Sequence, residues 1–144
     1  MKQSGRMLLP LIVLIAFVVA SVAFFVVSSS SPESVAKDFM SALSEGNAKK
    51  LAQLSYLEGA SQEQTEKIWR QTLDRGEYYR FAWRVKNSSE PTPDTATVNF
   101  DMFRSADNPG TYAENYALEL VKVQGQWKVD VRQIPRGLYP ALPR

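Results

Sequence analysis

Carboxylates and tyrosines are the side chains of this sequence best suited to acid–base chemistry. The 144-residue chain contains no histidine and no cysteine, which excludes Ser-His and Cys-His nucleophilic sites and any histidine-based metal site. An Asp/Tyr pair could still serve a hydrolase or isomerase, with Asp101 and Asp130 as the acidic candidates. The tyrosines that could accompany them are Tyr78, Tyr79, Tyr112 and Tyr116.

Alternation along the sequence argues against such a pair. Asp101 lies between Phe100 and Met102, and Asp130 follows Val129, so in a strand each carboxylate points away from the apolar face. We therefore expect both carboxylates in solvent and predict no catalytic residue. The acidic residues also show no spacing typical of a metal cluster, and we expect neither a metal nor a cofactor.

Aromatic side chains recur on the apolar faces of the predicted strands. They could line a cavity for a small hydrophobic ligand or lipid, or they could fill the space between sheet and helices. A small domain without disulfides needs large apolar side chains in its core, which favours the second alternative. The candidate cavity residues are Tyr79, Phe81, Trp83, Phe100, Tyr116 and Trp127.

Three amphipathic helices are predicted ahead of the strands. Residues with high capping preference precede each of them, namely Ser31, Asn47 and Ser61, and the last of these forms an S-x-x-Q capping-box pattern. Gly46 is placed to end the first helix. The predicted helices span residues 32–45, 48–57 and about 62–75.

Alternating apolar and polar residues predict strands over residues 78–86, 95–102, 111–123 and 127–131. Two prolines predict a loop over residues 87–94, whereas Gly125 predicts a tight hairpin. Consecutive strands without intervening helices indicate an antiparallel meander. The proline-rich tail, residues 135–144, is predicted to be irregular, either free or docked on a partner.

Helices followed by a meander resemble the nuclear-transport-factor-2-like superfamily, also described as the cystatin-like α+β cone. Residues 31–54, SPESVAKDFMSALSEGNAKKLAQL, are similar to its opening helices, and residues 117–134, ALELVKVQGQWKVDVRQI, to its closing hairpin. The resemblance implies an α+β fold in which about three helices pack on a curved antiparallel sheet. It implies no particular activity, because the superfamily includes enzymes, ligand binders and associative modules.

An apolar run without charge, residues 8–27, precedes this domain. A helix of that length spans roughly 30 Å, the hydrocarbon thickness of a bilayer. Lys2 and Arg6 are expected to keep the N-terminus in the cytoplasm, which places the following domain outside, in the periplasm. A cleaved signal peptide is the alternative, but this run is longer than the usual apolar stretch of about 7–15 residues.

The chain therefore divides into residues 1–30, a cytoplasmic end with a transmembrane helix, and residues 31–144, an extracytoplasmic domain. The only charged side chains of the first part are Lys2 and Arg6, which leaves the second part without net charge. Nucleic-acid binding domains usually carry a basic excess, so we expect no nucleic acid partner. Small residues in the apolar run would permit close contact with another membrane helix, namely Ala16, Ala20, Ser21 and Ala23.

The layout is also similar to that of membrane-anchored superfamily members with one N-terminal span. These include scaffold components of type IV secretion systems and envelope proteins of mycobacterial lipid-import complexes, although no motif here is unique to either. We expect a non-catalytic accessory or scaffold subunit of a complex in the cytoplasmic (inner) membrane, with other subunits as partners. A binder of a small hydrophobic ligand or lipid and an Asp/Tyr hydrolase or isomerase are the alternatives.

Overall fold

The computed structural model describes residues 30–76, 80–104, 113–139 and 142. The predicted membrane helix over residues 8–27 lies outside these ranges, as do its expected contact residues Ala16, Ala20, Ser21 and Ala23. Within the ranges that are described, no helix is long and apolar enough to cross a membrane.

Three helices of the described chain begin and end near the predicted residues: α2 (Pro32–Glu45), α3 (Ala48–Leu54) and α4 (Gln62–Arg75). Local capping accounts for their boundaries. The Ser31 hydroxyl accepts a hydrogen bond from the backbone N–H of Ser34, and Gly46 ends α2 in the left-handed conformation, with φ of 70°, which costs glycine little. A complete capping box between Ser61 and Gln64 opens α4.

The second helix is shorter than predicted. It ends at Leu54 because the next two residues form β1 (Ser55–Tyr56), which pairs in parallel with Val129 and Asp130. Local sequence favours continuing the helix, but pairing with an open strand edge satisfies the backbone groups of Ser55 and Tyr56 instead. This parallel pair makes the sheet mixed rather than purely antiparallel.

The remaining strands form the predicted antiparallel meander: β2 (Ala82–Thr92), β3 (Thr95–Phe103), β4 (Glu114–Val123) and β5 (Gln126–Asp130). The strand order across the sheet is β1-β5-β4-β3-β2. A short 3₁₀ helix, η1 (Val131–Gln133), replaces the predicted end of the last strand.

The prediction of a loop over residues 87–94 is wrong, because β2 continues to Thr92 and only Pro93 and Asp94 form the turn. Since β2 lies at the edge of the sheet, it forms ladder hydrogen bonds with β3 alone. An edge strand therefore tolerates Pro91, which has no backbone N–H to donate. The pairing with β3 is also irregular between Ser89 and Thr92, which accommodates the proline.

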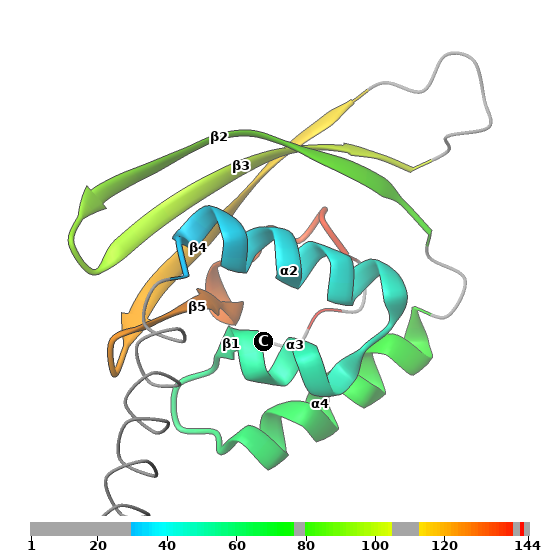
Figure 1. The fold of residues 1–144 in the computed structure, drawn as a ribbon. Coiled ribbons are helices and arrows are strands. Elements are labelled where there is room, and N and C mark those ends of the chain that lie inside the picture. The colour runs from blue at the N-terminus through cyan, green and yellow to red at the C-terminus, as the bar shows by residue number, and fades with distance from the viewer. Residues whose placement is uncertain (1–29, 77–79, 105–112, 140–141, 143–144) are drawn as a thin grey trace, which may run out of the picture. The chain divides into compact units, whose positions relative to one another are not determined.

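The helices lie on one side of the curved sheet, with α2 crossing its face and α4 beyond α3 (Figure 1). Between these layers, Phe39 of α2, Trp69 of α4 and Phe100 of β3 are fully buried. The Trp69 indole packs edge-on against Phe39, with ring centroids 5.7 Å apart. Its N–H donates a 3.0 Å hydrogen bond to the hydroxyl of Ser55, which ties α4 to β1.

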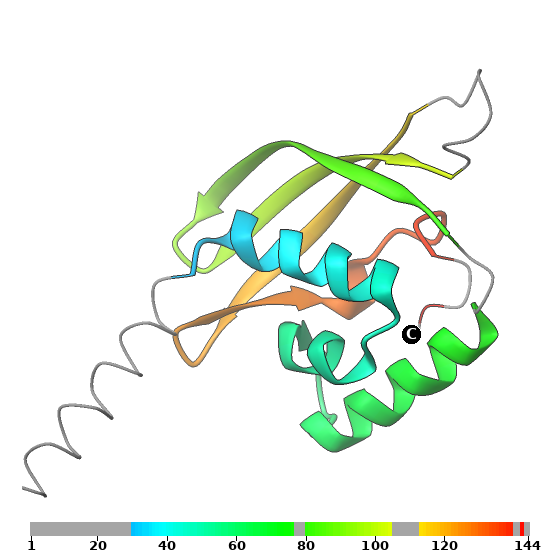
Figure 2. The same ribbon diagram turned by 45° about the vertical axis from the view of Figure 1, so that its right-hand side comes forward.

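The described part of the C-terminal segment packs on its own domain, from the end of η1 toward the helices (Figure 2). Leu138 is fully buried, and Ile134, Tyr139 and Leu142 belong to the same core. The tail is irregular as predicted, with turns rather than helix or strand after η1. It is not, however, a free terminus.

Candidate functional site

The predicted cavity residues occupy several parts of the fold. Phe100 is fully buried and packs edge-on against half-buried Trp83, with centroids 5.8 Å apart. Trp127 is buried on β5 beneath the ammonium of Lys122, and Phe81 packs against the tail residue Tyr139. Tyr116 belongs to a polar cluster, and Tyr79 lies outside the described residues.

Asp101 does not lie in solvent as expected; it is only 5% exposed. Its carboxylate is on the sheet face opposite Phe100, as alternation predicts, but long side chains of β2 cover it. Arg84 donates to Oδ2 from Nε at 2.9 Å and from Nη2 at 2.8 Å, and the Lys86 ammonium lies 3.6 Å from Oδ1. Asp130 is half-buried and caps η1 by accepting from the Arg132 amide.

The sheet face away from the helices is polar, and we refer to it as the outer sheet face. Its side chains pair across strands: Asn99 donates to Asn87 at 2.7 Å, and Thr97 donates to Glu119 at 2.8 Å. The ion pair of Asp101 belongs to the same face. The described residues of this face offer hydrogen-bonding groups to a partner, and their charged and amide groups are engaged with one another.

A carboxylate beside a tyrosine does occur, at the end of the sheet where β3 ends and β4 begins. Arg104 donates from Nε to both oxygens of Glu114 at 2.9 Å and from Nη2 to the Tyr116 hydroxyl at 3.1 Å. The Tyr116 hydroxyl in turn donates to Glu114. Sequence reasoning missed Glu114 and Arg104. The available signal was the spacing of two between Glu114 and Tyr116, which places both on one face of a strand.

The electrostatics of this cluster favour binding over proton transfer. The hydrogen bond from Tyr116, and then the pairing with Arg104, hold the pKa of Glu114 below its ordinary value, although burial opposes them. Burial and the bond to Glu114 raise the pKa of Tyr116. The carboxylate therefore stays ionised and the hydroxyl protonated near neutral pH, and a carboxylate with a lowered pKa is a weak general base.

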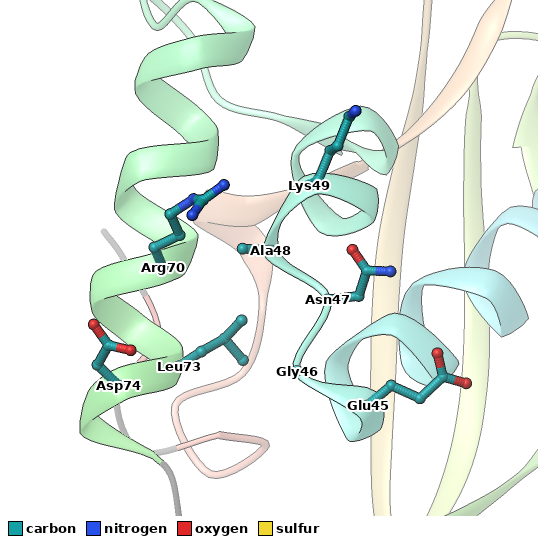
Figure 3. Close-up of a pocket in the computed structure, with 8 residues that line it drawn as sticks. All are labelled: Glu45, Gly46, Asn47, Ala48, Lys49, Arg70, Leu73 and Asp74. Atoms are coloured by element: carbon teal, nitrogen blue, oxygen red, sulfur yellow. The ribbon is translucent and has the colours of Figure 1, made fainter.

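A groove between α3 and α4 provides a second candidate site, with a volume of about 470 Å³. Figure 3 shows Lys49 and Arg70 near one end of it and Asp74 toward the other, with Leu73 pointing inward between the helices. Sequence analysis singled out none of these residues as a site. The groove is lined by Glu45, Gly46, Asn47, Ala48, Lys49, Arg70, Leu73 and Asp74.

The groove is suited to a polar occupant rather than to a metal or a reaction. Arg70 is already paired with Glu66 at 2.5 Å within α4. Among the residues whose structure is described, no group of three or more acidic side chains is placed to hold a metal ion. The groove can therefore supply hydrogen bonds and charge to a partner, but it brings together no nucleophile and base.

Comparison with solved structures identifies the fold. The chain is similar to a calcium/calmodulin-dependent protein kinase type II association domain from Thiobacillus denitrificans, with a TM-score of 0.51, 12% identity, and coverage of 69% of this chain and 89% of that one. A SEC-C motif containing protein from Rhodopseudomonas palustris has a TM-score of 0.50 and 18% identity, covering 69% and 75%. A domain with a cystatin-like fold from Nostoc punctiforme has a TM-score of 0.49 and 12% identity, covering 67% and 69%.

Other structural neighbours are described as NTF2-like proteins. At these identities the similarity concerns the fold alone. The structure itself has helices packed on a curved sheet (Figure 1), the α+β arrangement that the resemblance implied. No protein-family model and no curated protein matches the chain.

Proposed function

We propose that this chain is a non-catalytic accessory or scaffold subunit of a membrane-embedded complex. The observation that carries the proposal is that large apolar side chains of the described residues pack against one another between the sheet and the helices. Phe39, Trp69 and Phe100 are fully buried, and the tail residues Leu138 and Tyr139 are buried in the same core. Aromatic side chains that pack in the core contribute to stability rather than to a ligand site, which favours contacts with other molecules at the surface of the domain.

The chemistry of the acidic groups supports association over turnover. The Asp101 carboxylate is engaged by Arg84, and the Glu114 carboxylate by Arg104 and Tyr116. Acid–base catalysis needs a group whose pKa lies near the working pH. The lowered pKa of Glu114 moves it away from that range.

Residues 8–27 would hold the domain at the outer face of the cytoplasmic membrane, with the N-terminus inside. The small residues Ala16, Ala20, Ser21 and Ala23 would contact helices of other subunits. The outer sheet face and the groove between α3 and α4 are then available to their extracytoplasmic parts. Peptide mapping of the membrane-extracted protein is expected to recover residues 8–27, and a protein that lacks this apolar run would contradict the anchor.

Purification of the full chain from its native membrane in mild detergent, with mass spectrometry of the co-purifying proteins, tests the proposal. A photo-crosslinking residue replacing Asn87 on the outer sheet face should capture a membrane protein of the complex. The matched control replaces Lys67, which is exposed on α4 away from the sheet. A monomer without co-purifying membrane proteins, and without crosslinks from position 87, would overturn the proposal.

A further inference from the structure

The groove between α3 and α4 carries opposite charges at its two ends. The cationic side chains of Lys49 and Arg70 lie at one end, and the carboxylates of Glu45 and Asp74 lie at the other (Figure 3). Half-buried Leu73 points inward between them. The volume of about 470 Å³ is typical of a site for a compact ligand. A matching occupant therefore presents an anionic group, a cationic group and apolar surface between the two.

Most of these charges are not engaged within the domain. Among the described residues, the side chains of Lys49, Glu45 and Asp74 have no ion pair or hydrogen bond. Arg70 binds a single oxygen of Glu66 through both Nε and Nη2, so its Nη1 has no acceptor in the described part of the chain. A guanidinium can bind a second carboxylate through such a free edge. A partner with complementary charges would therefore find these groups available.

The positions of the charges along α4 set the spacing required in an occupant. Arg70 and Asp74 are four residues apart in α4, which corresponds to about 6 Å along the helix axis. In an extended chain, residues two positions apart are separated by roughly 6.6 Å and point to the same side. An acidic and a basic residue with one residue between them would thus reach both ends of the groove. The aliphatic stem of the basic residue can cover Leu73.

The groove lies far from the residue at which the domain joins the predicted anchor. Ser31 caps the start of α2, and Glu45 is its last residue. The 14 residues of α2 separate the two by about 21 Å. A protein segment outside the membrane is therefore a more suitable occupant than a lipid headgroup or a membrane helix.

From these observations we propose that the groove binds an extended segment of a partner subunit in which an acidic and a basic residue are separated by one residue. Lys49 and the Nη1 group of Arg70 bind the carboxylate, while Glu45 and Asp74 bind the cationic group. The proposal rests on the proposed function in one respect, that the partner is a protein outside the membrane. It adds the chemistry by which that partner is recognised.

The test is an NMR titration of the isotopically labelled full chain in detergent with a short peptide, SDAKS. We expect the amide signals of residues 46–49 and 70–74 to shift on binding. Two control peptides separate charge from spacing: SNAQS lacks both charges, and SDKAS places them on opposite sides of an extended chain. Because exposed ion pairs are individually weak, we expect each control to bind about fivefold more weakly than SDAKS.

Charge reversal at one end of the groove gives a sharper comparison. The double variant Lys49→Glu/Arg70→Glu should bind SDAKS about tenfold more weakly than wild type and should prefer a peptide with two basic residues, SKAKS. A general loss of stability would not reverse the preference. The matched control, Lys67→Glu/Arg136→Glu, makes the same change in net charge at exposed positions outside the groove. It should leave the affinity for SDAKS nearly unchanged.

Two results would overturn the proposal. One is a wild-type titration in which SDAKS binds no better than SNAQS or leaves the groove signals unshifted. The other is a folded Lys49→Glu/Arg70→Glu variant that keeps the wild-type preference for SDAKS; if that variant does not fold, the wild-type titration decides. These experiments contain no partner subunit. Their failure therefore leaves co-purification untouched and is distinct from failure of the proposed function.

Discussion

The ion pair between Arg84 and Asp101 provides a test of what stabilises the outer sheet face. The Asp101 side chain is 7% exposed, whereas that of Arg84 is 70% exposed. Replacing Arg84 by Met keeps the apolar stem but leaves a carboxylate that water barely reaches. Replacing Asp101 by Asn leaves a guanidinium that is already largely hydrated. The two halves of the pair are therefore not equivalent.

The expected magnitudes follow from this asymmetry. Hydrogen bonds to charged groups contribute about 1.5–3 kcal/mol, and we expect Arg84→Met to lower the free energy of unfolding by about that amount. Lys86 lies 3.6 Å from the carboxylate and its side chain is 44% exposed, so Lys86→Met should cost less than about 1 kcal/mol. Arg70→Met is the matched control, because its pair with Glu66 lies on an exposed helix face and should contribute about 0.3–0.5 kcal/mol.

The double variant gives the decisive comparison. The expected loss for Arg84→Met arises because the buried Asp101 carboxylate is left without its guanidinium partner. Asp101→Asn should therefore cause little or no further loss in the Arg84→Met background. The coupling between the two positions should be about 1 kcal/mol or more.

Urea unfolding of the full chain in detergent, followed by tryptophan fluorescence, measures these values. All three tryptophans of the chain lie in the domain, so the signal reports on its unfolding. Equal losses for Arg84→Met and Lys86→Met, or strict additivity of Arg84→Met and Asp101→Asn, would refute the reasoning.

Two further predictions concern other buried polar contacts. Ser55→Ala removes the acceptor of the fully buried Trp69 indole N–H and should cost about 1–3 kcal/mol in urea unfolding. The loss should shrink in a Trp69→Phe background; an equal loss there would mean that Ser55 acts through another contact. Glu114 has a folded-state pKa below its ordinary value of 4.5, so its stabilising contribution is present above that value and is lost as the pH falls through the folded-state pKa. Wild type should therefore lose more stability than Glu114→Gln between about pH 5 and pH 3, and parallel pH profiles of the melting temperature would contradict this assignment.

Local signals predicted the helices well where the determinants lie within a few residues. Ser31, Gly46 and Ser61 act on backbone groups three or four positions away, so their effect is visible in the sequence. Alternation likewise predicted which residues of β3 face the helices. It could not predict that Asp101 is buried, because the side chains that cover it belong to another strand.

Pairing partners decided the segments that local sequence predicted poorly. Residues 87–92 contain a proline and polar residues, which favour a loop, yet they pair with β3 because an edge strand tolerates a missing N–H on one side. Ser55 and Tyr56 leave the helical pattern for the free edge of β5. In both cases backbone hydrogen bonds to another strand outweigh a small local propensity.

The sequence by itself determined the class of fold, the order of the three helices and the four longer strands, and the absence of histidine and cysteine chemistry, since these depend on residue type and on the spacing of apolar residues. The anchor over residues 8–27 also comes from sequence alone and stays a prediction. Only the tertiary structure brought Arg104 to Glu114 and Tyr116, and only it placed the proline-rich tail in the core. Those contacts join residues far apart in the chain, and their geometry depends on where the strands and α4 end in space.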